Sequence, residues 1–176
     1  MKTIFKVLLF ILLIFNFGCL SNDTKKYIRD LKSENVMVRN NAIYYLGKKK
    51  EKRAVPLLIE LLNNDQIKEI KLNAIESLGE IGEGSSVDAL VNVLKEKDND
   101  MRIAAVDALG KIREQKAVKP LINILSDRDI KVIAIWALGN IGGKSAIPIL
   151  TRLLHDQDKY VRYNAAKALN KIGSGK

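Results

Sequence analysis

The sequence predicts an all-α protein in which pairs of helices stack into a right-handed α-solenoid of about ten helices. A short motif that starts with alanine and ends in leucine–glycine or leucine–asparagine recurs along the chain, starting at Ala42, Ala74, Ala105, Ala134 and Ala165. The intervals between these alanines are 32, 31, 29 and 31 residues, a regular period that is typical of repeat proteins. Apolar residues recur at helical spacing in every unit, and no segment shows the alternation of a strand.

Each unit contains two amphipathic helices. In the first unit, Val38, Ala42 and Leu46 share one helical face, and Val55 and Leu58 begin a second such face. One helix of a pair cannot bury its apolar face alone, so neighbouring units must stack to form a continuous core. We expect a lone leading helix in "TKKYIRDLK", four complete pairs, and a closing helix that ends near Ile172.

Proline and aspartate mark the helix ends. Each proline of the chain lies in the first turn of a second helix, where a missing N–H is tolerated: Pro56, Pro120 and Pro148. Three aspartates stand four residues before a basic residue and are expected to be N-caps of first helices: Asp98, Asp127 and Asp158.

The first 18 residues fit an export signal. Lys2 and Lys6 precede an apolar run at 7–17, which is too short for a membrane-spanning helix. Gly18 and the single cysteine, Cys19, then follow in an arrangement that resembles the lipobox of bacterial lipoproteins, in which the cysteine carries diacylglycerol. The alternative is a leader that is cut elsewhere, with Cys19 incidental.

The predicted organisation is a signal peptide at 1–18, a tether at 19–23, the solenoid at 24–173 and a tail at 174–176. We therefore expect a lipid-anchored protein of the bacterial cell envelope, on its periplasmic or surface face. Leu20 after the cysteine favours the outer membrane by analogy with lipoprotein sorting.

The segments "DNDMRIAAVDALG" (98–110) and "DKYVRYNAAKALN" (158–170) resemble the HEAT-like repeats first recognised in phycobilisome chromophore lyases. The resemblance covers roughly residues 24–173 and implies the solenoid fold. That family contains lyases, glycosylases, hydroxylases and plain binding scaffolds, so the resemblance implies no single function.

No pattern of catalytic or metal-binding residues stands out. One histidine, His155, cannot supply a di-iron site, and one cysteine cannot supply a zinc site. The segment "LGNIGGKSA" (138–146) lacks the first glycine of a phosphate loop and follows a helix rather than a strand. We expect no enzyme activity, no cofactor and no metal, with a lyase-type activity left open by the family resemblance.

One basic residue precedes each repeat motif by three positions: Arg39, Lys71, Arg102, Lys131 and Arg162. A net charge of +10 suggests an anionic partner, and this column could form a nucleic-acid ladder. Its recurrence in every unit favours a structural role, with hydrogen bonds between neighbouring repeats, and no nucleic-acid partner is expected.

We predict that the protein is a scaffold that binds a protein partner. The family resemblance implies that the second helices line the concave side, where their solvent-facing positions would be Glu60, Asn63, Asn92, Lys95, Asn123, Ser126, Arg152 and His155. That surface is polar and of mixed charge, which suits a protein better than a small apolar ligand. The alternatives are a chromophore-lyase-type enzyme or a chaperone that uses the same groove.

Two further surfaces are candidates for contacts. The run "KKKEKR" (48–53) could contact anionic lipid head groups through Lys48, Lys49, Lys50, Lys52 and Arg53, or could be a solvated end of the array. On the first helices, Ile133 and Trp136 replace polar or small residues, which predicts a contact surface on the convex side. The alternative for Trp136 is a ring that lies flat over its own helix and a neighbouring one.

Overall fold

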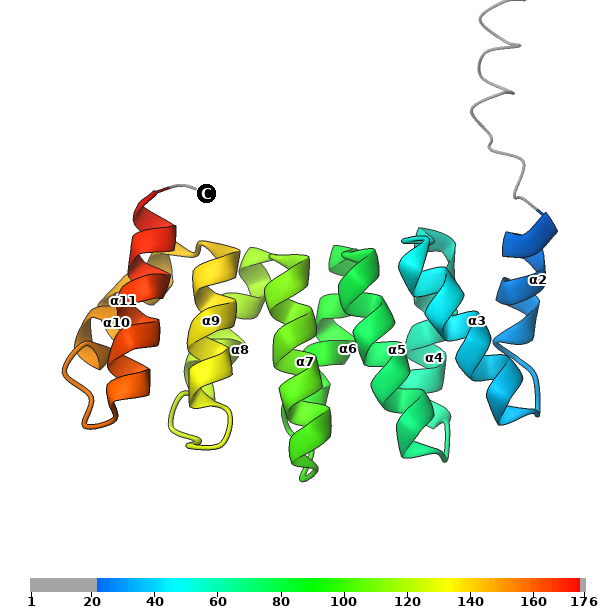
Figure 1. Ribbon diagram of the computed structural model, residues 1–176, viewed down its shortest axis with the longest axis horizontal. Coiled ribbons are helices and arrows are strands. Elements are labelled where there is room, and N and C mark those ends of the chain that lie inside the picture. Colours follow the sequence, from blue (N-terminus) through cyan, green and yellow to red (C-terminus); the bar gives the residue numbers. More distant parts are fainter. Residues whose placement is uncertain (1–21, 175–176) are drawn as a thin grey trace, which may run out of the picture.

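The computed structural model describes residues 22–174. Its ten α-helices are α2 (Asn22–Asp30), α3 (Val36–Lys48), α4 (Val55–Asn64), α5 (Lys68–Ile81), α6 (Val87–Val93), α7 (Asn99–Ile112), α8 (Val118–Asn123), α9 (Lys131–Ile141), α10 (Ile147–Leu153) and α11 (Lys159–Gly173). Four short 3₁₀ turns lead into the second helices: η1 (Lys52–Ala54), η2 (Gly84–Ser86), η3 (Gln115–Ala117) and η4 (Lys144–Ala146). Within these residues the fold is the expected α-solenoid, with a lone leading helix, four pairs and a closing helix (Figure 1). The predicted signal peptide, Cys19 and most of the tether lie outside the described residues.

Two of the three aspartates expected as N-caps cap first helices. Asp98 and Asp158 accept hydrogen bonds from the backbone N–H groups of Met101 and Tyr160, as N-caps do. The N-cap position of α9 is occupied by Ile130, without a side-chain hydrogen bond. Asp127 therefore does not cap α9 as expected, and its Oδ1 accepts from the N–H of Asp129 in the preceding turn at 3.0 Å.

The core runs without interruption along the array. The alanine, the residue after it and the leucine of each complete motif are fully buried between the two helix rows, as in Ala74, Ile75 and Leu78. Second helices contribute one apolar residue each to the middle of this layer, namely Leu58, Leu90, Leu121 and Leu150, all with no exposed surface. None of the helices in residues 22–174 is long and apolar enough to cross a bilayer.

First helices approach one another very closely. A β-carbon placed on Gly79 would lie 2.8 Å from the Cα of Ala108, and one placed on Gly139 would lie 2.9 Å from the Cα of Ala168. Only glycine fits at such a distance, so the glycine of the motif permits this approach. Successive first helices consequently pack directly on each other, whereas successive second helices are held farther apart.

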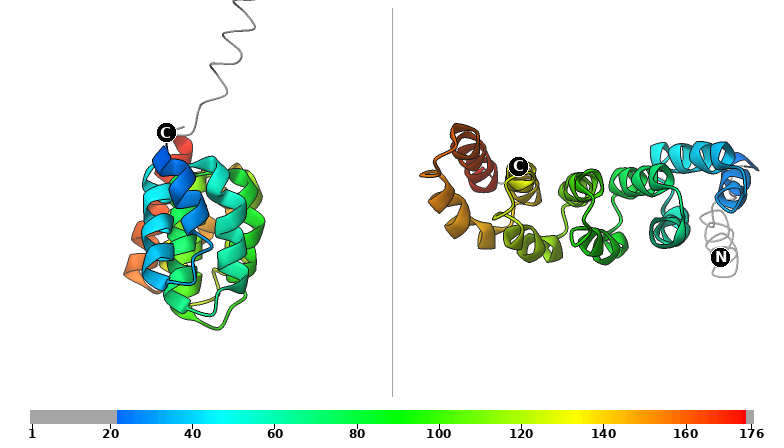
Figure 2. Two further views of the ribbon diagram at one scale, coloured as in Figure 1. Left: turned by 90° about the vertical axis from the view of Figure 1, so that its right-hand side faces the viewer. Right: turned by 90° about the horizontal axis from the view of Figure 1, so that it is seen from below.

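This difference in spacing sets the direction of curvature. Seen from below, the first helices α3, α5, α7, α9 and α11 form the inner row of a shallow arc, and the second helices form the outer row (Figure 2). The expectation that second helices line the concave side is therefore wrong. Closer spacing along one row bends a stack toward that row, and here the closely spaced row carries the glycines.

The two ends of the array depart from the repeat. In α3 the small residue that would contact a preceding glycine is replaced by Tyr45, whose ring stacks on Tyr27 of α2 with centroids 3.9 Å apart. In α11 the motif glycine is replaced by Asn170, which is exposed because no further helix of the described residues follows. Each terminal unit thus covers its open face with a larger side chain.

Candidate functional site

The basic column is mainly structural. The Arg39 Nε lies 3.0 Å from Asp65 Oδ2, and the Lys131 Nζ lies 3.2 Å from Asp156 Oδ2. Each pair joins a first helix to the loop that leads into the next unit. With side-chain exposures of 12% for Arg39 and 20% for Lys131, these charges are poorly placed to contact a nucleic acid.

The remaining members of the column differ in their partners. Arg102 Nη1 is 2.5 Å from Asp127 Oδ2, so the structural role is confirmed for this residue as well. Arg162 donates to the backbone carbonyls of Asp156 and Gln157 at 2.8 Å. No side-chain hydrogen bond of Lys71 to another described residue is present.

The same loops hold aspartates with lowered pKa values. Backbone N–H donation from Asp129, together with the hydrogen bond from Arg102, holds the pKa of Asp127 below its usual value. Donation from the Asp158 N–H and from Lys131 does the same to the pKa of Asp156. These carboxylates are tied to the fold and are not candidates for acid–base catalysis.

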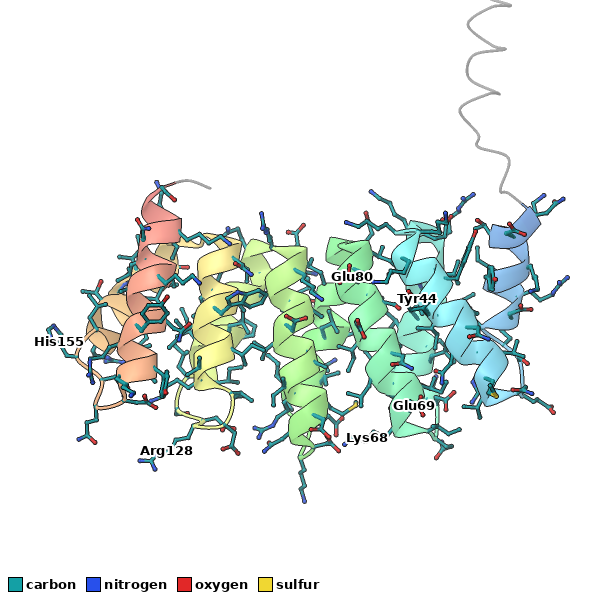
Figure 3. All side chains as sticks on the ribbon, viewed as in Figure 1. Tyr44, Lys68, Glu69, Glu80, Arg128 and His155 are labelled. Carbon is teal, nitrogen blue, oxygen red and sulfur yellow. The ribbon has the colours of Figure 1, made fainter. Side chains whose placement is uncertain are left out.

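The inner face is formed by the solvent-facing columns of the first helices. One column contains Tyr44, Glu76, Asp107, Trp136 and Lys167, and the adjacent column contains Asn41, Asn73, Ala104, Ile133 and Asn164. Both columns belong to the row of first helices, which faces the viewer in Figure 1. Figure 3 labels Tyr44 of the first column and also Glu80, which lies on α5 of the same row. Trp136 and Ile133 thus lie on the concave side and not on the convex side as expected.

A shallow groove runs between α3 and α5 on this inner face. Glu69, Glu76 and Glu80 of α5 line one side, and Tyr44 and Lys48 of α3 line the other. The groove is bridged by two side-chain hydrogen bonds, from Asn73 to Asn40 at 2.9 Å and from Asn40 to Glu69 at 3.3 Å.

Only some of the acidic groups on this face are neutralised. The Lys111 Nζ lies 2.8 Å from Glu80 Oε1 and 3.0 Å from Asp107 Oδ2. The hydrogen bond from Lys111 lowers the pKa of Glu80, and the same bond raises the pKa of Lys111. Glu76, by contrast, is exposed and makes no ion pair with another described residue. The centre of the inner face is therefore acidic, in a chain with a net charge of +10.

Trp136 is neither free in solvent nor part of the core. Its residue exposure is 36%, and its Cζ3 lies 2.7 Å from the point where a β-carbon at Gly110 would stand. The ring therefore lies across α9 and the neighbouring α7, and one part of it faces the inner surface. Its role as a partner contact stays a prediction.

The eight positions predicted on the second helices are all exposed: Glu60, Asn63, Asn92, Lys95, Asn123, Ser126, Arg152 and His155. Five of them lie on second helices, which form the outer row, whereas Lys95, Ser126 and His155 lie in the turns after α6, α8 and α10. Asn63 and Asn92 border one shallow hollow, and His155 borders another beside Arg128 and Asp156. Within residues 22–174 no three His, Cys, Asp or Glu side chains are grouped to hold a metal ion. The structure does not gather these eight positions into one site.

The two long edges of the array carry opposite charge. We define the turn edge as the start of α2, the turns within the pairs and the end of α11, at residues 22–26, 48–54, 80–86, 111–117, 140–146 and 171–174. It contains twelve basic and five acidic residues. We define the loop edge as residues 30–36, 62–69, 94–100, 125–131 and 154–160 at the opposite ends of the helices, where seven basic residues face eleven acidic ones.

The predicted membrane-surface residues lie on the turn edge. The five predicted residues are all exposed, at the end of α3 and in the turn that leads to α4: Lys48, Lys49, Lys50, Lys52 and Arg53. This turn is at the upper edge of the array in Figure 1. Two of them are partly neutralised, because Lys52 pairs with Glu83 at 2.7 Å and Arg53 pairs with Glu51 at 2.8 Å. Sequence reasoning did not include Arg113 and Lys144, which lie on the same edge.

The stacked helix pairs define a repeat solenoid of the kind that presents an extended surface. Family models match the chain in two forms: HEAT repeats at residues 64–132 and 118–176, and the PBS lyase HEAT-like repeat at residues 38–64. These matches extend over more than half of the sequence, and the chain belongs to the HEAT-repeat family. A search of the curated proteins gives no match.

Solved structures with similar folds include natural and designed proteins. A chain from the complex of CpcE and CpcF of phycocyanin lyase from Nostoc sp. PCC7120 is 26% identical, with a TM-score of 0.74, and the match covers 89% of this chain and 67% of that chain. A designed armadillo repeat protein in complex with the peptide (KR)4 is 21% identical, with a TM-score of 0.62, and the match covers 83% and 80% of the two chains. The second likeness concerns the fold alone.

Proposed function

We propose that this protein is a HEAT-repeat scaffold, held at a bacterial cell envelope membrane by a lipid on Cys19, that binds a protein partner along its concave face. It acts without a cofactor or a metal and does not act as an enzyme. The proposal rests on which side chains the inner face exposes and which are used in contacts between repeats. Three of the five basic-column residues form ion pairs that join the repeats, while Tyr44, Glu76 and Trp136 of the inner column are exposed to a partner.

The properties of this face suit a protein surface. The groove between α3 and α5 is open and polar, with carboxylates and amides along its walls and one tyrosine ring. Protein interfaces combine such polar groups with aromatic residues, whereas small-molecule sites are enclosed and mostly apolar. The similar structure from phycocyanin lyase supports this direction, since it is a complex of two chains, CpcE and CpcF.

A site-specific cross-linking experiment tests the proposed face. A photo-reactive amino acid replaces Glu76 on the inner row in one variant and Glu60 on the outer row in a matched variant, and both are expressed in intact cells. We expect a discrete cross-linked protein from position 76 and none from position 60. Capture from position 60 alone would assign binding to the outer row.

A second experiment shows whether the captured protein binds there. The substitutions Glu76→Lys and Asp107→Lys reverse the central charge of the inner face, and we expect the complex to be lost in co-purification. The variant Glu60→Lys changes the same charge on the outer row and should leave the complex intact. Unchanged complex with the inner-face variants would contradict the proposal.

The likeness to a phycocyanin lyase chain favours one alternative, a lyase-type enzyme that uses the same face; a chaperone that uses this face is the other. Absorbance of the purified protein separates the lyase from a scaffold, because a bound chromophore absorbs visible light and a scaffold does not. A colourless protein that still forms the complex supports the scaffold.

A further inference from the structure

Two basic residues occupy positions where the repeat otherwise uses glycine. One column follows the isoleucine near the end of each first helix, a position that Lys49 occupies in the first unit, and this column reads Lys50, Gly82, Arg113, Gly142 and Gly173. Gly82 and Gly142 have φ angles of 78° and 75°, in the left-handed region that ends many helices. Lys50 and Arg113 adopt the same region, with φ angles of 51° and 61°.

The left-handed conformation is unfavourable for a residue with a β-carbon. Glycine adopts it freely, and the two other turns of the array use glycine for it. Backbone strain that persists at particular residues is a reason to look for a function of those side chains. Both residues that depart from glycine here are basic, and both lie on the turn edge.

The charges of the surrounding residues also indicate a function for the turn edge. Lys25, Lys48, Lys49, Lys50, Arg113 and Lys144 are exposed on the turn edge and make no ion pair with another described residue. The loop edge on the opposite side of the molecule is net acidic. Such an asymmetry gives the turn edge an attraction for an anionic surface and repels the loop edge from it.

The position of α2 determines which edge of the array would lie near a lipid anchor on Cys19. α2 begins at Asn22 on the turn edge (Figure 1). Three peptide units separate Cys19 from Asn22, and they can span at most about 11 Å when fully extended. A lipid on Cys19 would therefore hold the turn edge, and not the loop edge, close to the head groups.

We propose that the whole turn edge, with Lys50 and Arg113 as its specific contacts, lies against the anionic lipid head groups of the membrane. The solenoid then stands on this edge, and its inner face remains open to one side. The inference takes its setting from the lipid anchor of the proposed function, but it concerns a different surface from the partner site. It extends the expected contact of residues 48–53 to all the turns of the array.

The test uses substitutions that remove charge and backbone strain together. The chain from residue 19 onward, with Cys19→Ser, keeps every helix and core residue of the described fold. In this background, Lys50→Gly/Arg113→Gly removes two charges from the turn edge. Lys97→Gln/Arg128→Gln removes two exposed and unpaired charges from the loop edge and serves as the matched control.

Binding is measured by sedimentation with phosphatidylcholine vesicles that contain phosphatidylglycerol, and with phosphatidylcholine alone. We expect binding only to the anionic vesicles, and a loss of about thirty-fold in partitioning for the turn-edge variant, given the usual contribution of each basic residue near such a surface. The loop-edge variant should partition as the unsubstituted protein does. The melting temperature of the turn-edge variant should be no lower than that of the unsubstituted protein, so the loss would not reflect unfolding.

Other outcomes overturn the inference. Equal losses for both variants would show a general effect of net charge, and equal binding of all proteins would show that the turn edge is not involved. A lower melting temperature of the turn-edge variant would show that Lys50 and Arg113 serve the fold. Binding to duplex RNA that exceeds vesicle binding and is lost with the same substitutions would assign the edge to a nucleic acid. Failure of lipidation at Cys19 would leave all these results unchanged, because the assay uses the unlipidated chain.

Discussion

Gly79 and Ala108 bring two neighbouring helices to a distance at which a single methyl group does not fit. A β-carbon on Gly79 would stand 2.8 Å from the Cα and 2.9 Å from the Cβ of Ala108. Both neighbours of the missing methyl are fixed parts of α7, so they cannot rotate away. The same close contact recurs between successive first helices. The first helices are therefore the inner row of the array, and the candidate partner surface lies on them.

The first prediction concerns this contact. Gly79→Ala should lower the free energy of unfolding by about 1–3 kcal/mol, the usual effect of overpacking. The better helix propensity of alanine offsets part of that loss, by about 1 kcal/mol at most. Gly173→Ala is the control, because a β-carbon there meets nothing within 4 Å. Urea unfolding measures both variants, and a higher stability of Gly79→Ala than of the unsubstituted protein would show that α5 and α7 are not so closely packed.

The second prediction concerns pH. The pKa of Asp127 is lowered by the Asp129 N–H and by Arg102, so its contribution to stability is present above the unfolded pKa, near 3.8, and is lost as the pH falls through the folded value. Asp98 and Asp156 have lowered pKa values for similar reasons. We expect the melting temperature to fall as the pH is taken from about 5 to about 3.

Asp127→Asn tests the origin of that dependence. The amide oxygen can still accept from the Asp129 N–H, but the charge opposite Arg102 is gone. The variant should be less stable at neutral pH, and the difference from the unsubstituted protein should shrink on acidification. A difference that stays constant with pH would exclude a role for the carboxylate charge.

The third prediction uses the only tryptophan. Because the Trp136 ring is partly covered by α7, its emission should lie between those of buried and free tryptophan, and acrylamide should quench it in part. Gly110→Ala places a methyl group 2.7 Å from Cζ3, so the ring should be displaced toward solvent and its emission should shift to the red. Gly79→Ala, one unit away, should leave the emission unchanged. A blue-shifted emission in the unsubstituted protein that resists quenching would exclude Trp136 from any partner contact.

The fourth prediction concerns the anchor. Cys19→Ser should move the protein from the membrane fraction to the soluble fraction, because the acyl chains supply about 0.8 kcal/mol for each buried CH₂ group. Cell fractionation and mass spectrometry of the mature N-terminus measure the change. Sedimentation of the variant with membranes, with an uncleaved leader, would contradict lipidation.

Much of the fold could be predicted because similar residues recur at equivalent positions of successive repeats. The buried alanine of each motif, the buried leucine of the first four motifs and the prolines that begin second helices are local features, and each occupies its expected place. The basic column was also assigned correctly at Arg39, Arg102 and Lys131, since recurrence in every unit indicates a contact that every unit makes.

The prediction that the second helices form the concave face was wrong. Solvent-facing columns can be found from helical periodicity on either row, and Trp136 was found in this way. Periodicity does not show which row is more closely spaced, because spacing depends on which side chains meet between helices. The glycine that controls it is 29 residues from its contact in the case of Gly79 and Ala108.

The start of α9 shows the same limit on a smaller scale. The 29-residue interval before this unit indicates a shortened loop, and Asp127 retains the spacing of a cap. In the folded chain Asp127 caps a turn and pairs with Arg102 of another helix. The sequence position of Asp127 is that of a helix cap, but its carboxylate instead forms an ion pair between two units.

The amino-acid order alone sets the repeat, the helix pairs, the buried columns and the position of the single cysteine, because these depend on neighbours within a few turns of one helix. The curvature, the composition of the inner face and the opposite charge of the two long edges arise only when the units are stacked. Lys50 and Arg113 are 63 residues apart in the chain and share one edge because each lies just beyond the end of a first helix of the same array. Successive first helices lie close together because glycine stands between them, and successive second helices lie farther apart, so a periodic sequence forms two distinct surfaces.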